Sequence, residues 1–305
     1  TNKKSDMGLQ TSEIIKKVTL ALETLDTEYL IILGDRFESF GAATAAHLLG
    51  IKNIHLHGGE TSLGAIDDKL RHAISQLSTI HFTSAEIHKR KVEEIIGSKK
   101  NVFNVGPMVI DGFLNLKLLS RKDFTKSTGF VFSDRNFIVT FHPETLSNDF
   151  GIQGLENLLR CLKNKDCNIL FTAPNADAGS DMIWKLINNF VDQNKNQCLF
   201  VPSLGQELYL NALLLFDWVI GNSSSGIVEA PILKARVLNI GDRQKGRYKF
   251  GNVIDVDNDY DSISNVVNNI FCKSEIRDFN YMKFRESIKR NSPTRKIVDL
   301  LKDIL

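Results

Sequence analysis

The chain has few cysteines, no long apolar run and no excess of either charge, and each absence excludes a class of protein. Its four cysteines in 305 residues lack CxxC spacing, so we expect free thiols and no disulfide framework. No apolar run reaches the roughly 18 residues of a membrane-spanning helix. No apolar segment follows the first lysines, as one would in a signal peptide. These absences predict a cytoplasmic protein.

The balance of charge argues against a partner that is bound by bulk electrostatics. The 38 basic residues nearly equal the 36 acidic ones, for a net charge of +2, so nucleic acid is not an expected partner. No membrane partner is expected either. Hydrophobic residues make up 42% and charged residues 24%, which excludes a disordered, collagenous or coiled-coil chain. The length predicts two domains, each with its own core.

Common cofactor motifs are missing as well. The sequence contains neither GxxxxGK[ST] nor GxGxxG, the usual phosphate-binding patterns. Six of the seven histidines precede residue 89, but none shows HxxxH or HxxEH spacing. We therefore expect no metal and no other cofactor.

The sequence does contain short apolar runs that alternate with amphipathic stretches of helical length. Continuously apolar runs are typical of parallel strands that are covered on both faces. Two such series, separated by a polar stretch at 120–135, predict an α/β fold with two doubly wound Rossmann-like domains facing a cleft. Strands are expected at 29–33, 53–57, 80–83, 101–106, 136–141, 167–173, 198–201, 217–222, 237–241 and 252–256, and helices at 37–49, 68–77, 85–96, 110–118, 151–163, 180–190, 205–215 and 224–230.

The beginning of the chain departs from this pattern. Ser12 is the expected N-cap of a first helix, and this helix precedes the first strand at 29–33. A doubly wound sheet normally opens with a strand and a phosphate-facing loop. We therefore interpret the first strand as missing from this chain.

Polar residues stand where the predicted strands end, which is where α/β sheets bind ligands. Gly34 permits a sharp turn after the first strand, and Asp35 and Arg36 follow it. As an alternative, Asp35 caps the next helix. The second strand ends in HLHGGE, where alternation predicts that His55 and His57 point to the same side.

Further candidates lie at other junctions of strands and helices. Asp67 and Arg71 stand four residues apart on one helix face, either as site residues or as a simple ion pair. In the second half, Pro143 keeps His142 out of helical geometry at a strand end. Asn175 ends another strand. The alternative for His142 is an ordinary polar residue whose hydrogen bonds are satisfied.

The segment GNSSSGIVEAP at 221–231 is the most informative. The main-chain N–H groups and the hydroxyls of Ser223 and Ser224 at a helix start predict an anion site that suits a pyrophosphate. Glu229 is placed to accept hydrogen bonds from a ribose diol, and Arg243 ends the next strand. A capped helix without a ligand is the alternative.

Several segments together resemble a known family: GDRFESFGAATAAHLLGI, HLHGGETSLGAIDDKLRHAISQLSTIHF, FHPETL, PNADAGS and GNSSSGIVEAP…NIGDRQKGR. They resemble the UDP-N-acetylglucosamine 2-epimerases, in particular the hydrolysing branch of sialic acid and legionaminic acid biosynthesis. The resemblance implies a glycosyltransferase-B-like fold and a homodimer. We expect a first domain at 1–118, a UDP-binding domain at 119–290, and a C-terminal helix at 291–305 that packs back on the first domain. Members of this family begin earlier, with a strand and a Gly-Thr-Arg-Ala-Asp type loop.

Roles are carried over from this family by motif. Acids implicated in catalysis match Asp35 and Asp67, and a histidine near the phosphates matches His142. Some relatives have a catalytic glutamate where this chain has His57, so either His57 or Glu60 transfers the proton. The substrate-binding set implied by the resemblance and by the strand ends comprises Arg36, Arg71, Asn175, Ser223, Ser224, Glu229 and Arg243.

The reaction implied by the resemblance converts UDP-N-acetylglucosamine and water to N-acetylmannosamine and UDP. The C2 proton and UDP are eliminated, and water adds to the resulting 2-acetamidoglucal. One alternative is the same reaction on UDP-N,N′-diacetylbacillosamine in legionaminic acid synthesis. A UDP-sugar glycosyltransferase and a nucleotide-sugar sensor are alternatives of other classes.

Overall fold

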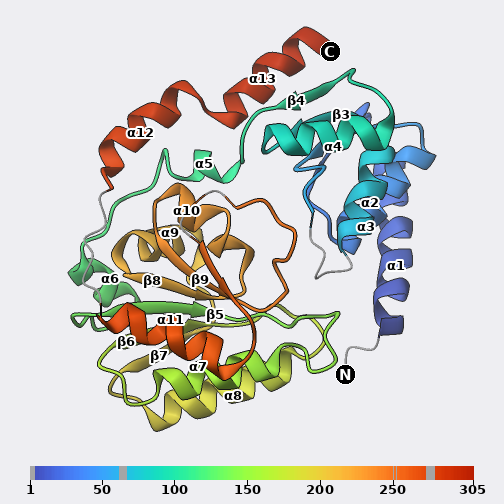
Figure 1. Cartoon of the computed structure of the whole chain (residues 1–305). Helices are drawn as coiled ribbons and strands as arrows, with labels where there is room; N and C mark the ends of the chain where they lie inside the picture. Colours follow the sequence, from blue (N-terminus) through green and yellow to red (C-terminus); the bar gives the residue numbers. More distant parts are fainter. Residues whose placement is uncertain (1–3, 62–66, 250, 252, 273–278) are drawn as a thin grey trace. The chain divides into compact units, whose positions relative to one another are not determined.

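The chain divides into two units, and each contains one parallel sheet flanked by helices (Figure 1). The computed structural model describes residues 4–61, 67–249, 251, 253–272 and 279–305. Unit 1 comprises Thr1–Gly112 and Ser287–Leu305, and unit 2 comprises Phe113–Glu286. The predicted α/β fold with two Rossmann-like domains is confirmed. None of the described helices is long and apolar enough to cross a membrane.

Unit 1 is built on a sheet with the strand order β1-β2-β3-β4. Every pair of neighbouring strands in it is parallel. The strand order follows the chain, so right-handed crossovers place the connecting helices on one face. The unit contains α1 (Lys4–Glu23), β1 (Tyr29–Leu33), α2 (Phe37–Leu48), β2 (Lys52–Leu56), α3 (Asp67–Gln76), β3 (Ser78–Thr83), α4 (Glu86–Ile96), β4 (Val102–Asn104), α5 (Val109–Gly112) and α13 (Pro293–Ile304).

Both faces of this sheet bury apolar side chains. On one face, Ile32 packs with Ala43 of α2 and Ile74 of α3. On the other, Ile54 and its neighbours pack with Ile297 of α13. The C-terminal helix α13 thus covers the face that the crossover helices leave open.

Several local predictions for unit 1 are wrong. Ser12 is not an N-cap, because α1 already begins at Lys4 and the Ser12 hydroxyl donates to the Leu9 carbonyl at 2.7 Å. His57 lies outside β2 with a left-handed φ of 66°, so strand alternation does not relate it to His55. The helix expected at 110–118 is only the four-residue α5.

Unit 2 has the strand order β10-β9-β8-β5-β6-β7, also wholly parallel. Helices α7, α8 and α11 pack against one face of this sheet. The strand order reverses between β5 and β8, which is where doubly wound sheets bind ligands. The unit contains α6 (Arg121–Thr128), β5 (Asn136–Thr140), α7 (Ile152–Leu162), β6 (Asn168–Thr172), α8 (Ser180–Gln193), β7 (Cys198–Val201), α9 (Gly205–Leu215), β8 (Trp218–Gly221), η1 (Ser224–Gly226), α10 (Glu229–Ile232), β9 (Arg236–Ile240), β10 (Val253–Val256) and α11 (Tyr260–Cys272), and α12 (Tyr281–Arg290) leads from unit 2 to unit 1.

The polar stretch at 120–135 that separates the two predicted series is itself structured. It forms α6, capped by the Ser120 hydroxyl, which accepts from the Asp123 N–H. Its aromatic residues then pack on one another and on Phe216, with ring centroids 5.6 Å apart for Phe124 and 4.8 Å for Phe130. The stretch therefore contributes to a small aromatic core, which its mostly polar composition did not indicate.

Replacing Phe124 by alanine should lower the free energy of unfolding by about 3–5 kcal/mol, because the ring is fully buried and leaves a cavity. Urea denaturation measures the effect. Val131→Ala is the matched control, since Val131 lies in the same stretch but is 65% exposed. Equal stability of the two variants would contradict the packing described here.

Candidate active site

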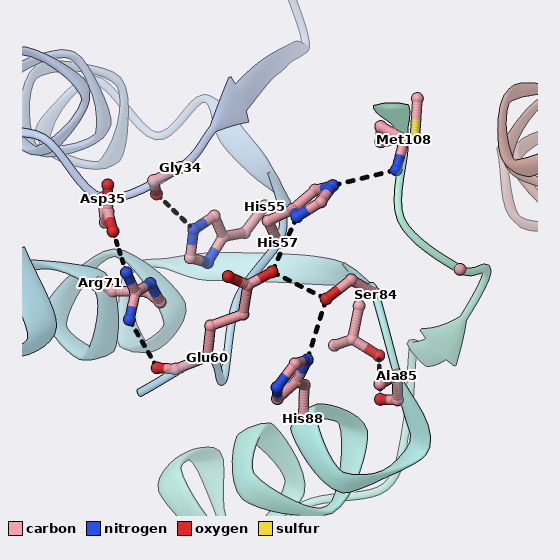
Figure 2. Close-up of polar contacts among 12 residues, drawn as sticks. Gly34, Asp35, His55, His57, Glu60, Arg71, Ser84, Ala85, His88 and Met108 are labelled. Atoms are coloured by element: carbon pink, nitrogen blue, oxygen red, sulfur yellow. Dashed lines mark hydrogen bonds and ion pairs between the residues drawn. The ribbon is translucent and has the colours of Figure 1, made fainter. Parts of the chain in front are cut away.

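Asp35 of unit 1 is held by a buried arginine. Gly34 turns the chain after β1 with a φ of 84°. The N-cap position of α2 is Arg36, so the alternative role of Asp35 as a cap is wrong. Instead Asp35 pairs with Arg71, whose side chain is only 1% exposed. Arg71 also pairs with Asp68 at 3.3 Å. It donates to the Glu60 carbonyl at 2.6 Å (Figure 2).

The structure brings His57 and Glu60 together. The Nδ1 of His57 lies 2.8 Å from Glu60 Oε1, and the Met108 N–H donates to His57 Nε2 at 3.2 Å. Because Nε2 accepts this bond, the ring carries its proton on Nδ1 and donates it to the carboxylate. Both ring nitrogens of His57 therefore have protein partners (Figure 2).

Two glycines allow the HGGE loop to take this path. A Cβ on Gly58 would lie 2.9 Å from His55 Nδ1. Gly59 has a φ of 77°, and a Cβ there would collide with the His88 carbonyl. The loop is therefore confined between the end of β2 and the first turn of α4, which fixes the position of Glu60.

His55 supports the first strand end and does not share the environment of His57. It donates from Nε2 to the Gly34 carbonyl at 2.9 Å, and its Nδ1 lies 3.1 Å from the Ser75 hydroxyl. Burial lowers the pKa of His55 to about 4, so the ring is neutral at pH 7. The turn that presents Asp35 is thus tied to β2.

Two further candidates of unit 1 are Asp67 and Arg36. Asp67 is the first residue of α3 and is half-buried. Arg36 is exposed and lies 3.2 Å from Glu38.

In unit 2, His142 follows β5 at the reversal of strand order. The Asn175 N–H donates to its Nδ1 at 3.0 Å, so the ring proton is on Nε2. Burial, followed by the charge of Arg243, lowers the pKa of His142 to about 3. The ring is a neutral donor at pH 7.

The side chain of Asn222 joins the two strand ends at this reversal. It accepts from the His142 N–H at 2.7 Å and donates to the His142 carbonyl at 2.9 Å. The main-chain carbonyl of Asn222 accepts from Arg243 at 3.1 Å and from Gln244 at 2.7 Å. His142, Asn175 and Arg243, predicted separately, are therefore part of one hydrogen-bonded cluster.

The prediction of one continuous helix at 224–230 is wrong. The chain makes the 3₁₀ turn η1 and then the four-residue α10, which begins at Glu229. The Ser223 hydroxyl accepts from the Ser225 N–H at 3.4 Å, and Ser225 also bonds to Tyr209. A full helix dipole is thus absent here, and the hydroxyls and main-chain N–H groups of this turn are the candidate anion-binding groups.

Sequence reasoning missed several residues of these clusters. The Ser84 hydroxyl donates to Glu60 Oε1 at 2.7 Å. Ser84 follows β3 directly, so the strand-end rule that selected Asp35 would also have found it. Tyr209 lies within α9 and gave no signal. Asn222 gave none either, because its role depends on contact with a strand 80 residues earlier in the chain. Among the described residues, no three His, Cys, Asp or Glu side chains are grouped to hold a metal ion.

The fold and these clusters define an α/β protein of the glycosyltransferase-B-like class. Residues 1–302 match the family described as UDP-N-acetylglucosamine 2-epimerase. The chain belongs to this family.

Individual relatives agree with this assignment. The chain is 37% identical over 243 residues to the GDP/UDP-N,N'-diacetylbacillosamine 2-epimerase (hydrolyzing) of Campylobacter jejuni, covering 79% of this chain and 63% of that protein. It is 31% identical over 287 residues to the UDP-N,N'-diacetylbacillosamine 2-epimerase (hydrolyzing) of Legionella pneumophila, covering 94% and 75%. The chain thus spans less than two thirds of the Campylobacter relative.

A solved structure agrees with the fold. The UDP-GlcNAc 2-epimerase from Neisseria meningitidis, bound to UDP-GlcNAc, superimposes with a TM-score of 0.74 at 17% identity, covering 97% of this chain and 82% of that one.

Acidification should destabilise the protein through its buried histidines. Burial lowers the pKa of His55 and of His81 from 6.5 to about 4, so the unfolded chain binds more protons below pH 6.5. Stability is therefore greatest above pH 6.5 and falls towards pH 4, by up to about 1.4 kcal/mol per pH unit for each histidine. Denaturation at a series of pH values measures this slope. His81→Leu should reduce the slope by the contribution of one histidine, that is by the uptake of about one proton on unfolding. A slope that His81→Leu leaves unchanged would contradict this account.

Proposed function

We propose that this chain carries the activity of a hydrolysing UDP-N-acetylglucosamine 2-epimerase, which converts UDP-N-acetylglucosamine and water to N-acetylmannosamine and UDP. Family membership supports the reaction class. The observation that carries the proposal is the grouping of Asp35 and Glu60 around Arg71, which pairs with the first and bonds to the main chain of the second. Carboxylates fixed at the ends of parallel strands suit proton transfer at a sugar carbon.

The first step breaks the C2–H bond and the bond from C1 to the UDP oxygen. A base takes the C2 proton, the C1=C2 double bond of 2-acetamidoglucal forms, and UDP leaves with the bond electrons. Water then adds its hydroxyl at C1 and gives up its other proton to a base, while an acid delivers a proton to C2 from the other face. Both nitrogens of His57 have protein partners, which favours Glu60 over His57 for proton transfer. Asp35 and Asp67 are the other candidate acids.

Unit 2 supplies groups for the leaving UDP. The neutral His142 offers its Nε2–H, and Arg243 offers a cation, for the charge that develops on the diphosphate. Ser223 and Ser224 add hydroxyl donors, and Glu229 is our candidate acceptor for the ribose hydroxyls. A homodimer and a cytoplasmic location stay predictions from the family and the composition.

The second candidate is the same reaction on UDP-N,N′-diacetylbacillosamine. It is favoured by the names of the Campylobacter and Legionella relatives. The two sugars share the diphosphate, C1 and the C2 acetamido group, so the groups described above serve both.

Proton NMR in D₂O with each sugar nucleotide tests the reaction. Release of UDP together with free N-acetylmannosamine deuterated at C2 is the expected result, and turnover of the diacetamido sugar alone would select the second candidate. Asp35→Ala or Asp67→Ala should lower turnover by roughly 10²–10⁴-fold, whereas Asp26→Asn, an exposed acid in the same unit, should not. If neither sugar reacts while UDP still binds, the chain is a transferase or a sensor.

Removal of two hydroxyls should weaken UDP binding. In Ser223→Ala/Ser224→Ala, two candidate hydrogen bonds to a charged phosphate are lost, each worth about 1.5–3 kcal/mol, so Kd for UDP should rise by roughly 100-fold or more. Isothermal titration calorimetry measures this. Ser203→Ala, an exposed serine of the same unit, is the control. An unchanged Kd in the double variant would remove these serines from the UDP site.

A further inference from the structure

We propose that Ser84 and His88 are positioning residues that hold the Glu60 carboxylate for proton transfer. The inference rests on the proposed function and extends it to two side chains that the sequence analysis did not select. Ser84 directly follows β3, and His88 lies in the first turn of α4. Both are buried, with exposures of 4% and 6%.

The contacts form a continuous line that ends on one carboxylate oxygen. Ser84 Oγ donates to Glu60 Oε1 at 2.7 Å, and His88 Nδ1 lies 2.9 Å from the same hydroxyl. His57 donates to Oε1 from the other side. Figure 2 shows the two approaches meeting at this oxygen.

The number of hydrogens fixes the direction of each bond. A serine hydroxyl has a single hydrogen, and that of Ser84 is donated to Glu60. The bond between Ser84 and His88 must therefore be donated by His88 Nδ1–H. On the other branch, the Met108 N–H fixes the tautomer of His57. Two branches of donors thus converge on Oε1.

The position of the Ser84 hydroxyl is not explained by helix capping. The N-cap of α4 is Ala85, which makes no side-chain cap hydrogen bond. The Ser84 hydroxyl instead bonds across to a loop 24 residues earlier. The same loop touches α4 a second time, where Gly59 leaves no room for a Cβ against the His88 carbonyl. Two independent contacts therefore fix the position of the HGGE loop relative to the start of α4.

This arrangement has two consequences for Glu60. Hydrogen bonds donated to a carboxylate stabilise its ionised form, so the donors favour a base that is ready to accept a proton. They also restrict the rotation of the side chain, and proton transfer depends steeply on geometry. Loss of the donors should therefore affect turnover more than substrate affinity.

Steady-state kinetics of Ser84 and His88 variants over a range of pH test the proposal. Ser84→Ala should lower kcat by roughly 10- to 100-fold, the equivalent of one hydrogen bond to a charged group. KM should change little, and the acidic limb of the kcat profile should move to higher pH. His88→Leu should act in the same direction, and His88→Asn, which keeps an N–H donor near the Nδ1 position, should restore most of the loss.

Ser78→Ala is the matched control. Ser78 begins β3, the strand that Ser84 follows, and its hydroxyl donates to the Ile74 carbonyl at 2.7 Å. Its kinetics should equal those of the wild type, and thermal unfolding of all variants separates catalytic loss from loss of folding. If Ser84→Ala fails to fold, the comparison of His88→Leu with His88→Asn decides instead.

The outcomes separate this proposal from the proposed function. An active wild type whose Ser84→Ala and His88→Leu variants keep the wild-type kcat and pH profile would overturn only the positioning role. Equal losses in His88→Leu and His88→Asn would also overturn it. A wild type that turns over neither sugar nucleotide would overturn the proposed function and this role together.

Discussion

A guanidinium group buried away from water must be paired. In unit 1 this requirement positions the turn after β1 and the HGGE loop, which both contact the buried arginine. Arg71 is 1% exposed, and it pairs with Asp35 and Asp68 while donating to the Glu60 carbonyl. These partners come from the turn after β1, from α3 itself and from the HGGE loop. Loss of one partner of a buried ion pair costs about 3–5 kcal/mol. The positions of the candidate acids therefore depend on this arginine, which acts within the protein whether or not it also touches the substrate.

Unit 2 achieves the same end with a neutral group. The side-chain amide of Asn222 bonds both to the N–H and to the carbonyl of His142, while the main-chain carbonyl of Asn222 accepts from Arg243 and Gln244. A carboxamide can do this because it carries both a donor and an acceptor. His142 is kept neutral by burial, so its Nε2–H can donate without bringing a second full charge beside Arg243. Each unit thus fixes its candidate site residues through the hydrogen bonds of a buried polar side chain.

The sequence predicted the alternation of strands and helices and the parallel sheets, because continuous apolar runs reflect burial on both faces. It also selected Asp35, His142 and Arg243 by the strand-end rule. Predictions of local structure were wrong where the contact that decides it comes from a residue far away in the sequence. The 120–135 stretch was interpreted as a polar break because most of its residues are polar. Its three phenylalanines pack on Phe216, far along the chain, and nothing within the stretch indicates this contact. His57 leaves strand geometry because it bonds to the Met108 N–H and to Glu60.

By itself, the sequence determined the fold class, the family and the set of strand ends that carry polar residues, because these depend on residue type and spacing along the chain. Only the tertiary structure decided how those residues are connected. It paired Arg71 with Asp35, assigned the ring proton of His57, and brought Ser84 and His88 to Glu60. The reason is physical: a hydrogen bond depends on distance and direction in space. No periodicity in the sequence records the distance between residues that different strands and helices bring together.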